Sequence, residues 1–442
     1  MTFPSNFLWG AATSSYQIEG GGLSEGRGES IWDRFSHTPG KVHNGDSGDV
    51  ACDHLHLYPS DVALMSELGL KAYRFSTSWS RVLPAGVGDV NPAGLDFYDR
   101  LTDELLKHHI QPYLTLYHWD LPQALQDRGG WANPDSVHWF ADYADVMTRR
   151  LGDRVQSWVT LNEPWCISLL SNMLGEHAPG NQDPVIAYRV AHHLNLAHGA
   201  AMRVIRRNCP GVSAGITLNL SPSTPLTDSG SDQQAAEFYD GWYNRWFLDP
   251  VLKGTYPDDM VELLTPVLVD LDLDAVKTAA EPMDFLGVNY YTRAVVKYNA
   301  DKSLPFEDVD LDDVDRTGME WEIYPRGLTD LLVRLHHDYA PKAIYITENG
   351  AAFDDPAPVD GLVEDAPRRA YLEAHLRACE AAIIQGVPLA GYFAWSLLDN
   401  FEWAYGYDKR FGIIHVDFDT QKRTFKRSAR YYQSVIAHNG LD

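Results

Sequence analysis

Short apolar stretches of strand length alternate along this chain with longer stretches whose apolar residues recur at helical spacing. Residues 343–348, for example, form an apolar, β-branched run that ends at Asn349-Gly350, a turn signal, as a buried strand would. The pattern predicts eight strands, over residues 7–14, 71–76, 111–119, 158–163, 213–220, 284–291, 343–348 and 389–396.

A predicted helix follows each of these strands. Val62, Met65 and Leu68 show helical spacing behind the first strand, and Asn133-Pro134 reads as an N-cap followed by a proline in the first helical position. The other helices are predicted over residues 92–109, 184–208, 235–252, 326–337, 368–385 and 427–437. Eight strand–helix units favour an α/β fold of the (β/α)8, or TIM, barrel type over an open sheet.

No break in composition divides residues 1–442, so we expect a single barrel domain. The acidic tract 307–315 lacks the glycine and final glutamate of a calcium-binding EF-hand loop. We expect it to be a solvated loop between the sixth strand and its helix.

Two of the predicted strands end in a glutamate, Glu163 and Glu348. Either one alone reads as a salt-bridge partner or a cap, but the carboxyl ends of all barrel strands face one mouth. Paired carboxyl groups at a sugar-shaped pocket serve glycoside hydrolysis, one as acid/base and the other as nucleophile. We expect Arg74 and the Tyr291 hydroxyl to favour the anion of Glu348. Trp165 and the charge of Glu348 should raise the proton affinity of Glu163.

The remaining strand ends carry groups suited to sugar binding. Amides, imidazoles and hydroxyls bond to sugar hydroxyls, and indole rings offer flat apolar faces. Besides the two glutamates, the predicted mouth holds Gln17, Arg74, His118, Trp119, Asn162, Asn219, Asn289, Tyr291, Trp395, Glu402 and Trp403.

The charge balance excludes some classes of partner. The chain has 61 acidic and 36 basic residues, a net charge of −25, which repels polyanions, so no nucleic-acid partner is expected. No apolar stretch approaches the length of a membrane span, so no membrane partner is expected. Four widely spaced cysteines suggest reduced, mostly buried thiols, and residues 1–7 lack the features of a signal peptide, so a cytoplasmic location is predicted.

No cofactor or metal is expected. No G-x-G-x-x-G follows the first strand, and Gly20-Gly21-Gly22 lacks the lysine of a phosphate-binding loop. His54 and His56 lack a third ligand at metal-binding spacing, so a structural role is predicted for both.

Seven motifs follow one another along the chain: FLWGAATSSYQIEG at 7–20, YRFS at 73–76, YHWDLP at 117–122, TLNEP at 160–164, NYYT at 289–292, ITENG at 346–350 and WSLLDNFEW at 395–403. Their identity and order resemble the family 1 glycoside hydrolases of the bacterial β-glucosidase type. The resemblance covers essentially the whole chain.

The resemblance implies that Glu348 is the nucleophile and Glu163 the acid/base of a retaining mechanism. It implies a substrate-binding set for the cleaved sugar, with Asn162 on the 2-hydroxyl and Trp395 as the pocket floor. That set comprises Gln17, His118, Asn162, Tyr291, Trp395, Glu402 and Trp403, supported by Arg74 and Asn289. The aglycone side is expected to comprise Trp165, Leu170, Asn219 and Trp321.

The expected substrate is a small β-glucoside or a cello-oligosaccharide. Gln17 and Glu402 read the 4-hydroxyl in many relatives that accept either epimer, so β-galactosides and β-fucosides are further candidates. The sequence leaves room for a homo-oligomer.

Two other functions remain open at this stage. A 6-phospho-β-glycosidase of the same family would need cationic or hydroxyl groups where this chain has Glu402 and Trp403, because a carboxylate repels phosphate. A non-catalytic sugar-binding barrel would have lost one of the glutamates. Glu402 also has a simpler interpretation, as a solvated loop acid paired with Lys409 or Arg410.

Overall fold

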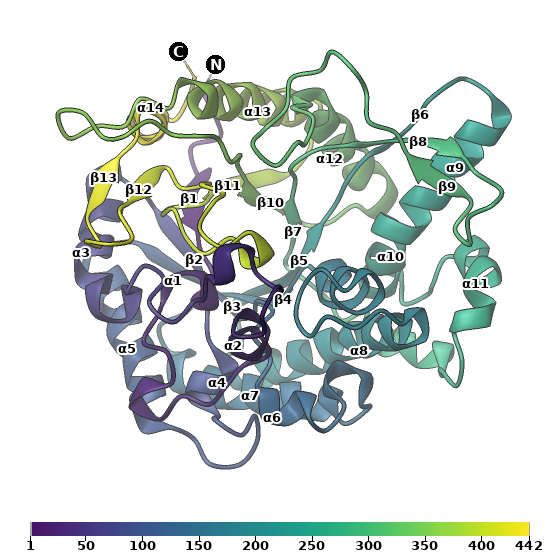
Figure 1. Cartoon of the computed structure of the whole chain (residues 1–442), viewed down its shortest axis with the longest axis horizontal. Helices are drawn as coiled ribbons and strands as arrows, with labels where there is room; N and C mark the ends of the chain where they lie inside the picture. The colour runs from purple at the N-terminus through teal and green to yellow at the C-terminus, as the bar shows by residue number, and fades with distance from the viewer. Residues whose placement is uncertain (1, 442) are drawn as a thin grey trace.

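The computed structural model describes residues 2–441 and has at its centre a closed barrel of eight parallel strands (Figure 1). The order around the barrel is β1-β11-β10-β7-β5-β4-β3-β2. These strands are β1 (Leu8–Ala12), β2 (Ala72–Ser76), β3 (Gln111–Tyr117), β4 (Ser157–Asn162), β5 (Ser213–Asn219), β7 (Phe285–Asn289), β10 (Ile344–Asn349) and β11 (Leu389–Trp395). Each lies within or next to a predicted strand, and the (β/α)8 barrel is confirmed.

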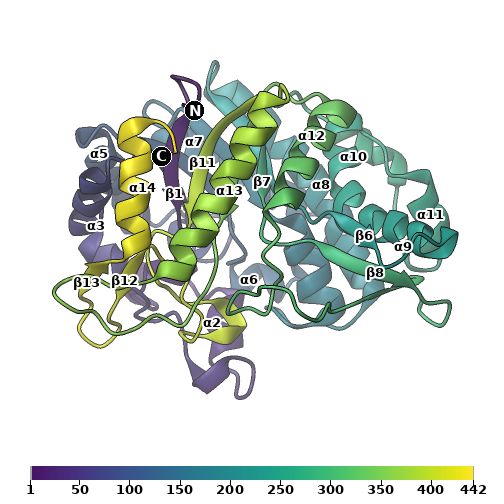
Figure 2. The same cartoon turned by 90° about the horizontal axis from the view of Figure 1, so that it is seen from above.

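Helices surround the barrel and cover the outer faces of its strands (Figures 1 and 2). They are α3 (His54–Leu68), α5 (Pro92–Lys107), α7 (Ser136–Leu151), α8 (Pro184–Asn208), α9 (Gly230–Asp240), α10 (Trp246–Lys253), α12 (Pro325–Tyr339), α13 (Ala366–Ile384) and α14 (Arg427–His438). The start of α8 shows how sequence sets a boundary. The Asp183 side chain accepts hydrogen bonds from the backbone of Val185 and Ile186, and Pro184 takes the first helical position.

Shorter elements fill the loops between strands and helices. They are α1 (Ser15–Ile18), α2 (Ile31–Ser36), α4 (Trp79–Val82), α6 (Gln123–Gln126), α11 (Asp258–Leu264), β6 (Ser223–Pro225), β8 (Ala294–Tyr298), β9 (Phe306–Asp308), β12 (Ile414–Val416) and β13 (Arg423–Phe425).

Two predicted helices differ from those in the structure, one in its starting residue and one in its continuity. Helix α7 begins at Ser136 because the Asn133 side chain instead accepts from the backbone N–H of Asp135 in a turn ahead of the helix. The stretch predicted as one helix over 235–252 is divided by a π-helical segment (Gly241–Arg245) between α9 and α10. The Asn244 side chain in this segment exchanges hydrogen bonds with the backbone of Ser221, at 2.8 and 3.0 Å, which anchors the irregular turn.

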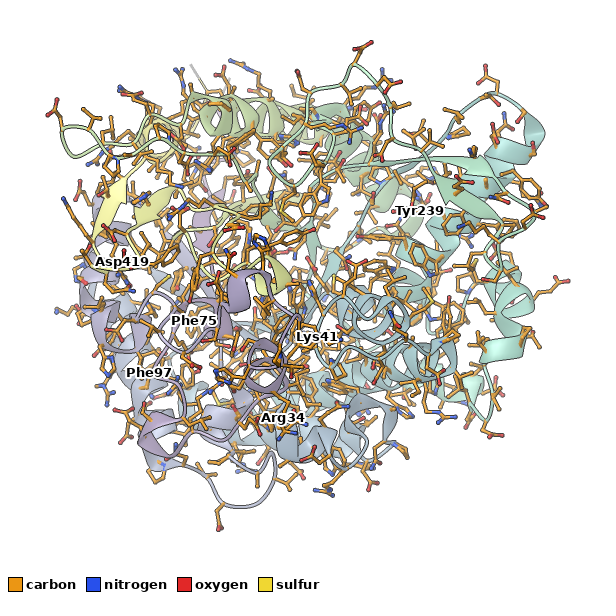
Figure 3. The ribbon with its side chains drawn as sticks, viewed as in Figure 1. Arg34, Lys41, Phe75, Phe97, Tyr239 and Asp419 are labelled. Atoms are coloured by element: carbon orange, nitrogen blue, oxygen red, sulfur yellow. The ribbon has the colours of Figure 1, made fainter. Side chains whose placement is uncertain are left out.

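The acidic tract 307–315 is not entirely a loop, which corrects the prediction. Its first residues belong to β9, which pairs antiparallel with β8 in a three-stranded sheet with β6. Tyr239, on α9, packs against Phe306 of this sheet with ring centroids 5.4 Å apart and lies on the same side of the molecule (Figure 3). The remainder of the tract is irregular and mostly exposed, as predicted.

The two ends of the chain lie side by side (Figures 1 and 2). The backbone N–H of Phe3 donates to the carbonyl of Asn439 at 2.8 Å, and Leu8 of the first strand pairs with Gly391 of the last. The barrel therefore closes through residues from opposite ends of the sequence.

Candidate active site

The carboxyl ends of the barrel strands open into one cavity of about 460 Å³. This volume lies in the range of small-molecule sites in proteins. Both Glu163 and Glu348 line the cavity, together with aromatic rings and amides. The two glutamates that the sequence placed at one mouth are therefore brought together.

Glu348 is held by one cation and one hydroxyl. Arg74 Nη1 donates to its Oε1 at 2.6 Å, and the Tyr291 hydroxyl donates to its Oε2 at 2.7 Å. Burial raises the pKa of Glu348, but the contacts from Arg74 and Tyr291 oppose that rise because they stabilise the anion. Of the two glutamates, Glu348 is thus the one whose surroundings favour the charged form.

Glu163 lies in a different environment. Asn289 Nδ2 donates to its Oε1 at 2.6 Å, and the thiol of Cys166 donates to its Oε2 at 3.0 Å. Neither partner is charged. Burial, together with the negative charge of Glu348, raises the pKa of Glu163 to about 7. Glu163 is therefore the glutamate whose surroundings favour the protonated form.

A buried amide connects the two carboxyl groups to the sugar-binding side. The Asn162 Oδ1 accepts from Arg74 at 2.6 Å and from Asn289 at 3.1 Å, and its Nδ2 donates to His118 Nε2 at 3.0 Å. Burial, and next the Arg74 charge, lower the pKa of His118 well below its ordinary value, so the ring is neutral. Since Nε2 accepts, the proton is on Nδ1, which has no protein partner among the described residues. That N–H is buried and is left with unused hydrogen-bonding capacity.

Glu402 has few protein partners. Its Oε2 accepts a long 3.4 Å bond from Gln17 Nε2, which bonds more closely to Phe401 O at 2.8 Å and to Asn400 Oδ1 at 3.0 Å. Burial and the charges of Glu348 and Glu163 raise the pKa of Glu402 to about 8. A carboxyl group with so little hydrogen bonding at a cavity wall is suited to a ligand rich in hydroxyls.

Glu402 does not pair with the nearby cations, so its simpler interpretation as a loop acid is wrong. Lys409 Nζ donates to the carbonyl of Gly318 at 2.6 Å, and Arg410 Nη1 donates to Asp399 at 2.8 Å. Asp399 also accepts from Lys426, which is fully buried, at 2.6 Å. These bonds fasten the segment between β11 and Glu402 rather than neutralising Glu402.

Indole and imidazole rings form the inner wall of the cavity. His118 stacks on Trp395 with an interplanar angle of 23° and a centroid separation of 5.7 Å, and on Trp403 at 24° and 6.0 Å. Trp119, Glu163 and Trp403 all have positive φ angles, of 81°, 53° and 50°. Residues other than glycine rarely adopt positive φ angles, and several such residues at one cavity are typical of a functional site.

The predicted site residues all lie at this cavity, although three do not line it. Gln17, Arg74 and Asn162 are fully buried, and each contacts a side chain that lines the cavity. The others line it directly. We call the residues predicted for the cleaved sugar the inner side and those predicted for the aglycone the outer side. The inner side comprises His118, Asn289, Tyr291, Trp395, Glu402 and Trp403, and the outer side comprises Trp165, Leu170, Asn219 and Trp321.

Several lining residues were not predicted. Trp119 was placed at the mouth but given no role, and Cys166, Glu176, His177, Tyr243 and Tyr405 were not considered. Cys166 could have been found, since it lies three positions after Glu163. The π-helical segment that begins there (Cys166–Leu174) directs its side chain to the cavity, and helical patterning does not reveal such a segment.

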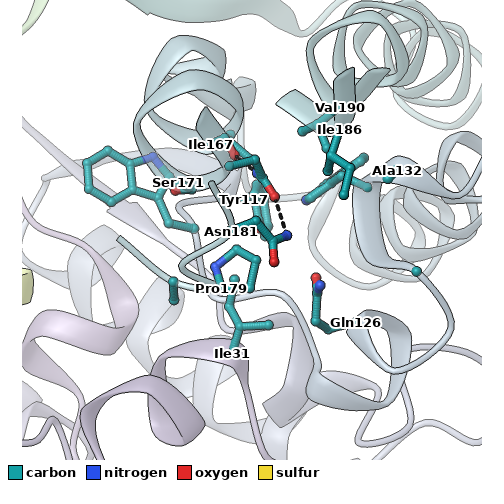
Figure 4. A pocket seen from close by; sticks show the side chains of 15 residues that line it. Ile31, Tyr117, Gln126, Ala132, Ile167, Ser171, Pro179, Asn181, Ile186 and Val190 are labelled. Carbon is teal, nitrogen blue, oxygen red and sulfur yellow. Dashed lines mark hydrogen bonds between the residues drawn. The ribbon is translucent and has the colours of Figure 1, made fainter. Parts of the chain in front are cut away.

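A second cavity, also lined by Trp119, is far smaller. Figure 4 shows this second cavity. Its volume is about 20 Å³, room for one water molecule. Figure 4 shows Asn181 at its edge, where the side chain donates to Asn172 Oδ1 at 2.8 Å. This space is too small for a sugar.

Within residues 2–441, no group of three or more His, Cys, Asp or Glu side chains is placed to hold a metal ion. His54 bonds to Asp61 at 2.8 Å in the interior, whereas His56 bonds to Asp53 at the surface. Cys52, Cys166, Cys209 and Cys379 are all buried and free of disulfides, as predicted. The described helices include none with the length and apolar character that a membrane crossing requires.

Comparison with known proteins agrees with this site. The sequence profile of Glycosyl hydrolase family 1 matches residues 1–441. Beta-glucosidase A of Acetivibrio thermocellus is 48% identical over 100% of this chain and 99% of its own length. A 1,4-beta-D-glucan glucohydrolase of Thermotoga neapolitana is 47% identical over 99% of each chain. The beta-glucosidase from Thermotoga maritima in complex with deoxynojirimycin superposes with a TM-score of 0.98 at 48% identity, over all of both chains.

The chain therefore belongs to glycosyl hydrolase family 1. It is a (β/α)8-barrel enzyme that hydrolyses glycosidic bonds.

Proposed function

We propose that this protein is a retaining β-glucosidase that removes terminal β-D-glucosyl residues from small glycosides and cello-oligosaccharides. The observation that carries the proposal is the asymmetric pair of carboxyl groups, with Glu348 beside a cation and Glu163 beside neutral donors. One group suited to attack and one suited to carry a proton are what double displacement requires. The names of the relatives support glucose as the cleaved sugar.

In the first step, Glu348 attacks the anomeric carbon as the glycosidic bond breaks, and Glu163 gives its proton to the leaving oxygen. The product is a glycosyl ester on Glu348. In the second step, Glu163, now an anion, takes a proton from water, the water oxygen attacks the anomeric carbon, and Glu348 leaves as a carboxylate. Each step inverts the anomeric configuration, so the overall result is retention.

The inner wall supplies the groups that hold the sugar. The Nδ1–H of His118 and the carboxyl oxygens of Glu402 have unused hydrogen-bonding capacity, and Trp395 offers an apolar face. Asn162 is held by Arg74 and Asn289, which ties the sugar-binding side to the catalytic pair. We assign Asn162 to the 2-hydroxyl, where hydrogen bonds strengthen in the transition state.

The 6-phospho-β-glycosidase alternative has little support. Lys409 and Arg410, the nearest candidate cations in sequence, are bonded to Gly318 and Asp399. Glu402, when ionised, would repel a phosphate in the same part of the cavity. The sugar-binding barrel without catalysis has less support still, because both glutamates are present.

The rest of the proposal concerns organisation. We propose that residues 1–442 act as one catalytic domain, since the barrel closes between β1 and β11 near the two ends of the chain. The free thiols of four buried cysteines support a reducing, cytoplasmic location.

A panel of aryl β-glycosides tests the function. Glucoside hydrolysis should exceed that of the 6-phosphoglucoside, with galactoside and fucoside also cleaved because Gln17 and Glu402 are both present. NMR of the first-formed sugar should show the β-anomer. An α-anomer, or a preference for the phosphorylated substrate, would reject the proposal.

A further inference from the structure

The thiol of Cys166 is the one protein donor on the Oε2 atom of Glu163 in the described hydrogen bonds. The other oxygen, Oε1, accepts from Asn289 at 2.6 Å. Cys166 is buried and also lines the cavity. Its thiol therefore lies where the catalytic proton of Glu163 is held and released.

A second contact fixes the direction of this thiol. Asn219 Nδ2 lies 3.8 Å from Cys166 Sγ as a donor and also donates to the Tyr243 hydroxyl at 2.8 Å. Because the sulfur accepts from Asn219 on one side, its own S–H is directed to Glu163 on the other. Burial and the nearby charge of Glu163 raise the pKa of the Cys166 thiol well above its ordinary value, so it keeps its proton.

We propose that Cys166 is a positioning residue for Glu163. The Cys166 S–H donates to Oε2 when Glu163 is an anion, and the Cys166 sulfur accepts only weakly when Glu163 carries its proton. Sulfur is a weak acceptor, so it competes poorly with the leaving oxygen for that proton. A hydroxyl at the same place would donate more strongly to the anion, and a methyl group would leave the anion without a donor. This inference rests on the proposed role of Glu163 as acid/base.

Other groups also act on the titration of Glu163 and remain unchanged in the variants below. The ionisable and charged groups that face Glu163 or Cys166 are Arg74, Glu176, Tyr243, Tyr291, Glu348 and Glu402. Because the parent and both variants contain all of these groups, a difference in the pKa of Glu163 between them reports the contact from residue 166.

The test compares Cys166→Ala and Cys166→Ser with the parent. Loss of a donor to the anion should move the basic limb of the kcat/KM profile up by about half a pH unit to one unit in Cys166→Ala. The stronger hydroxyl donor should move it down by a similar amount in Cys166→Ser. Cys209→Ala serves as the control, because that buried thiol precedes β5 at the opposite end of the barrel and should leave the limb in place.

A direct titration separates this inference from the proposed function. Carboxyl-carbon NMR of glutamate-labelled protein, with Glu163→Gln to assign the signal, gives the pKa of Glu163 without any turnover. Opposite shifts in the two variants support the inference. Glu163 pKa shifts of the same sign in both variants, or no shift, reject the inference. Variants that lose thermal stability without a change in the pKa of Glu163 reject it as well. If the NMR pKa moves as expected and the kcat/KM limb does not follow, Cys166 positions Glu163 but Glu163 is not the acid.

Discussion

The inner and outer halves of the cavity are built in different ways. On the inner half, most polar groups come from strand ends and are fixed by hydrogen bonds, as Asn289 is by Glu163 and Thr347 at 2.6 and 2.7 Å. Glu402, with one long bond, is the exception. On the outer half, Trp165 packs against Tyr243 with ring centroids 4.5 Å apart, and Tyr405 is 45% exposed. Hydrogen bonds fix direction, whereas ring contacts tolerate a change of shape.

The two kinds of wall should contribute differently to specificity. A polar wall without freedom of movement rejects a ligand that leaves its groups unpaired, and an apolar wall accepts any ligand of suitable area. The inner half should therefore be strict about the cleaved sugar, and the outer half permissive about the aglycone. Substitutions on the two sides should therefore differ in how strongly they reduce turnover.

Glu348→Gln should have the largest effect, because it removes the nucleophile. We expect kcat/KM for an aryl β-glucoside to fall by about 10⁴-fold or more. Asp310→Asn, on the outer wall, is the matched control and should retain activity within a few-fold. A comparable loss in both variants would mean that charge in the cavity, and not the nucleophile, is what matters.

Glu163→Gln should cost about 10²–10⁴-fold with poor leaving groups and far less with activated aryl leaving groups. Only the former need a proton as the bond breaks. The measurement is a plot of kcat/KM against leaving-group pKa, which should become steeper in the variant. Parallel lines for variant and parent would contradict the acid role.

Glu402→Ala should weaken both binding and turnover. Each hydrogen bond from a sugar hydroxyl contributes about 1.5–3 kcal/mol, or about 10–10²-fold, when Glu402 is ionised above its pKa of about 8, and less when the group is protonated. Part of the loss should appear in kcat, since bonds that tighten as the ring distorts act on the transition state. Full kcat/KM in the variant would show that Glu402 does not read the sugar.

Much of this site could be predicted from the sequence because it is built from strand ends. Glu163 and Glu348 each follow a short apolar run, and a barrel has one mouth, so the pattern alone brought them together. The contacts of Glu348 with Arg74 and Tyr291 were expected and are confirmed at 2.6 and 2.7 Å.

The parts that sequence reasoning missed depend on irregular backbone. The π-helical segment that directs Cys166 to the cavity and the positive φ at Trp119 have no helical or alternating signature. Strand β9 was missed because acidic residues are rare in strands, and its pairing with β8 outweighs that preference.

Trp321→Ala tests the outer half and should have a modest effect. Trp321 is half-buried and contacts Tyr291 with centroids 5.3 Å apart, so its loss removes apolar contact area for the aglycone. We expect KM to rise by less than about tenfold for aryl and cellobiose substrates, with kcat nearly unchanged. A large fall in kcat for every substrate would show that the outer wall also positions the sugar.

The smallest effect concerns stability and pH. The pKa of Glu402 is raised from an ordinary 4.5 to about 8, so between these values the native state holds a proton that the unfolded chain has released. Stability falls as pH rises through this window. Glu402→Gln removes the dependence, and its Tm should exceed that of the parent by a margin that grows from pH 5 to pH 9.

The control for this comparison is Glu320→Gln, at an exposed loop position. It should shift Tm equally at both pH values. If the Tm difference between Glu402→Gln and the parent is also the same at pH 5 and pH 9, ionisation of Glu402 does not destabilise the folded protein.

The bond between Gln17 and Glu402 joins residues 385 positions apart, and the Arg74–Glu348 pair joins residues 274 apart. At a synthesis rate of about 5–20 residues per second, Gln17 waits about 20–80 s on the ribosome before its partner is made. A nascent chain that ends before residue 348 therefore lacks the nucleophile, and one that ends before residue 402 lacks part of the sugar-binding wall. Catalysis should begin only after Glu402 has been made and β11 has paired with β1, so a chain truncated before Glu402 should be inactive.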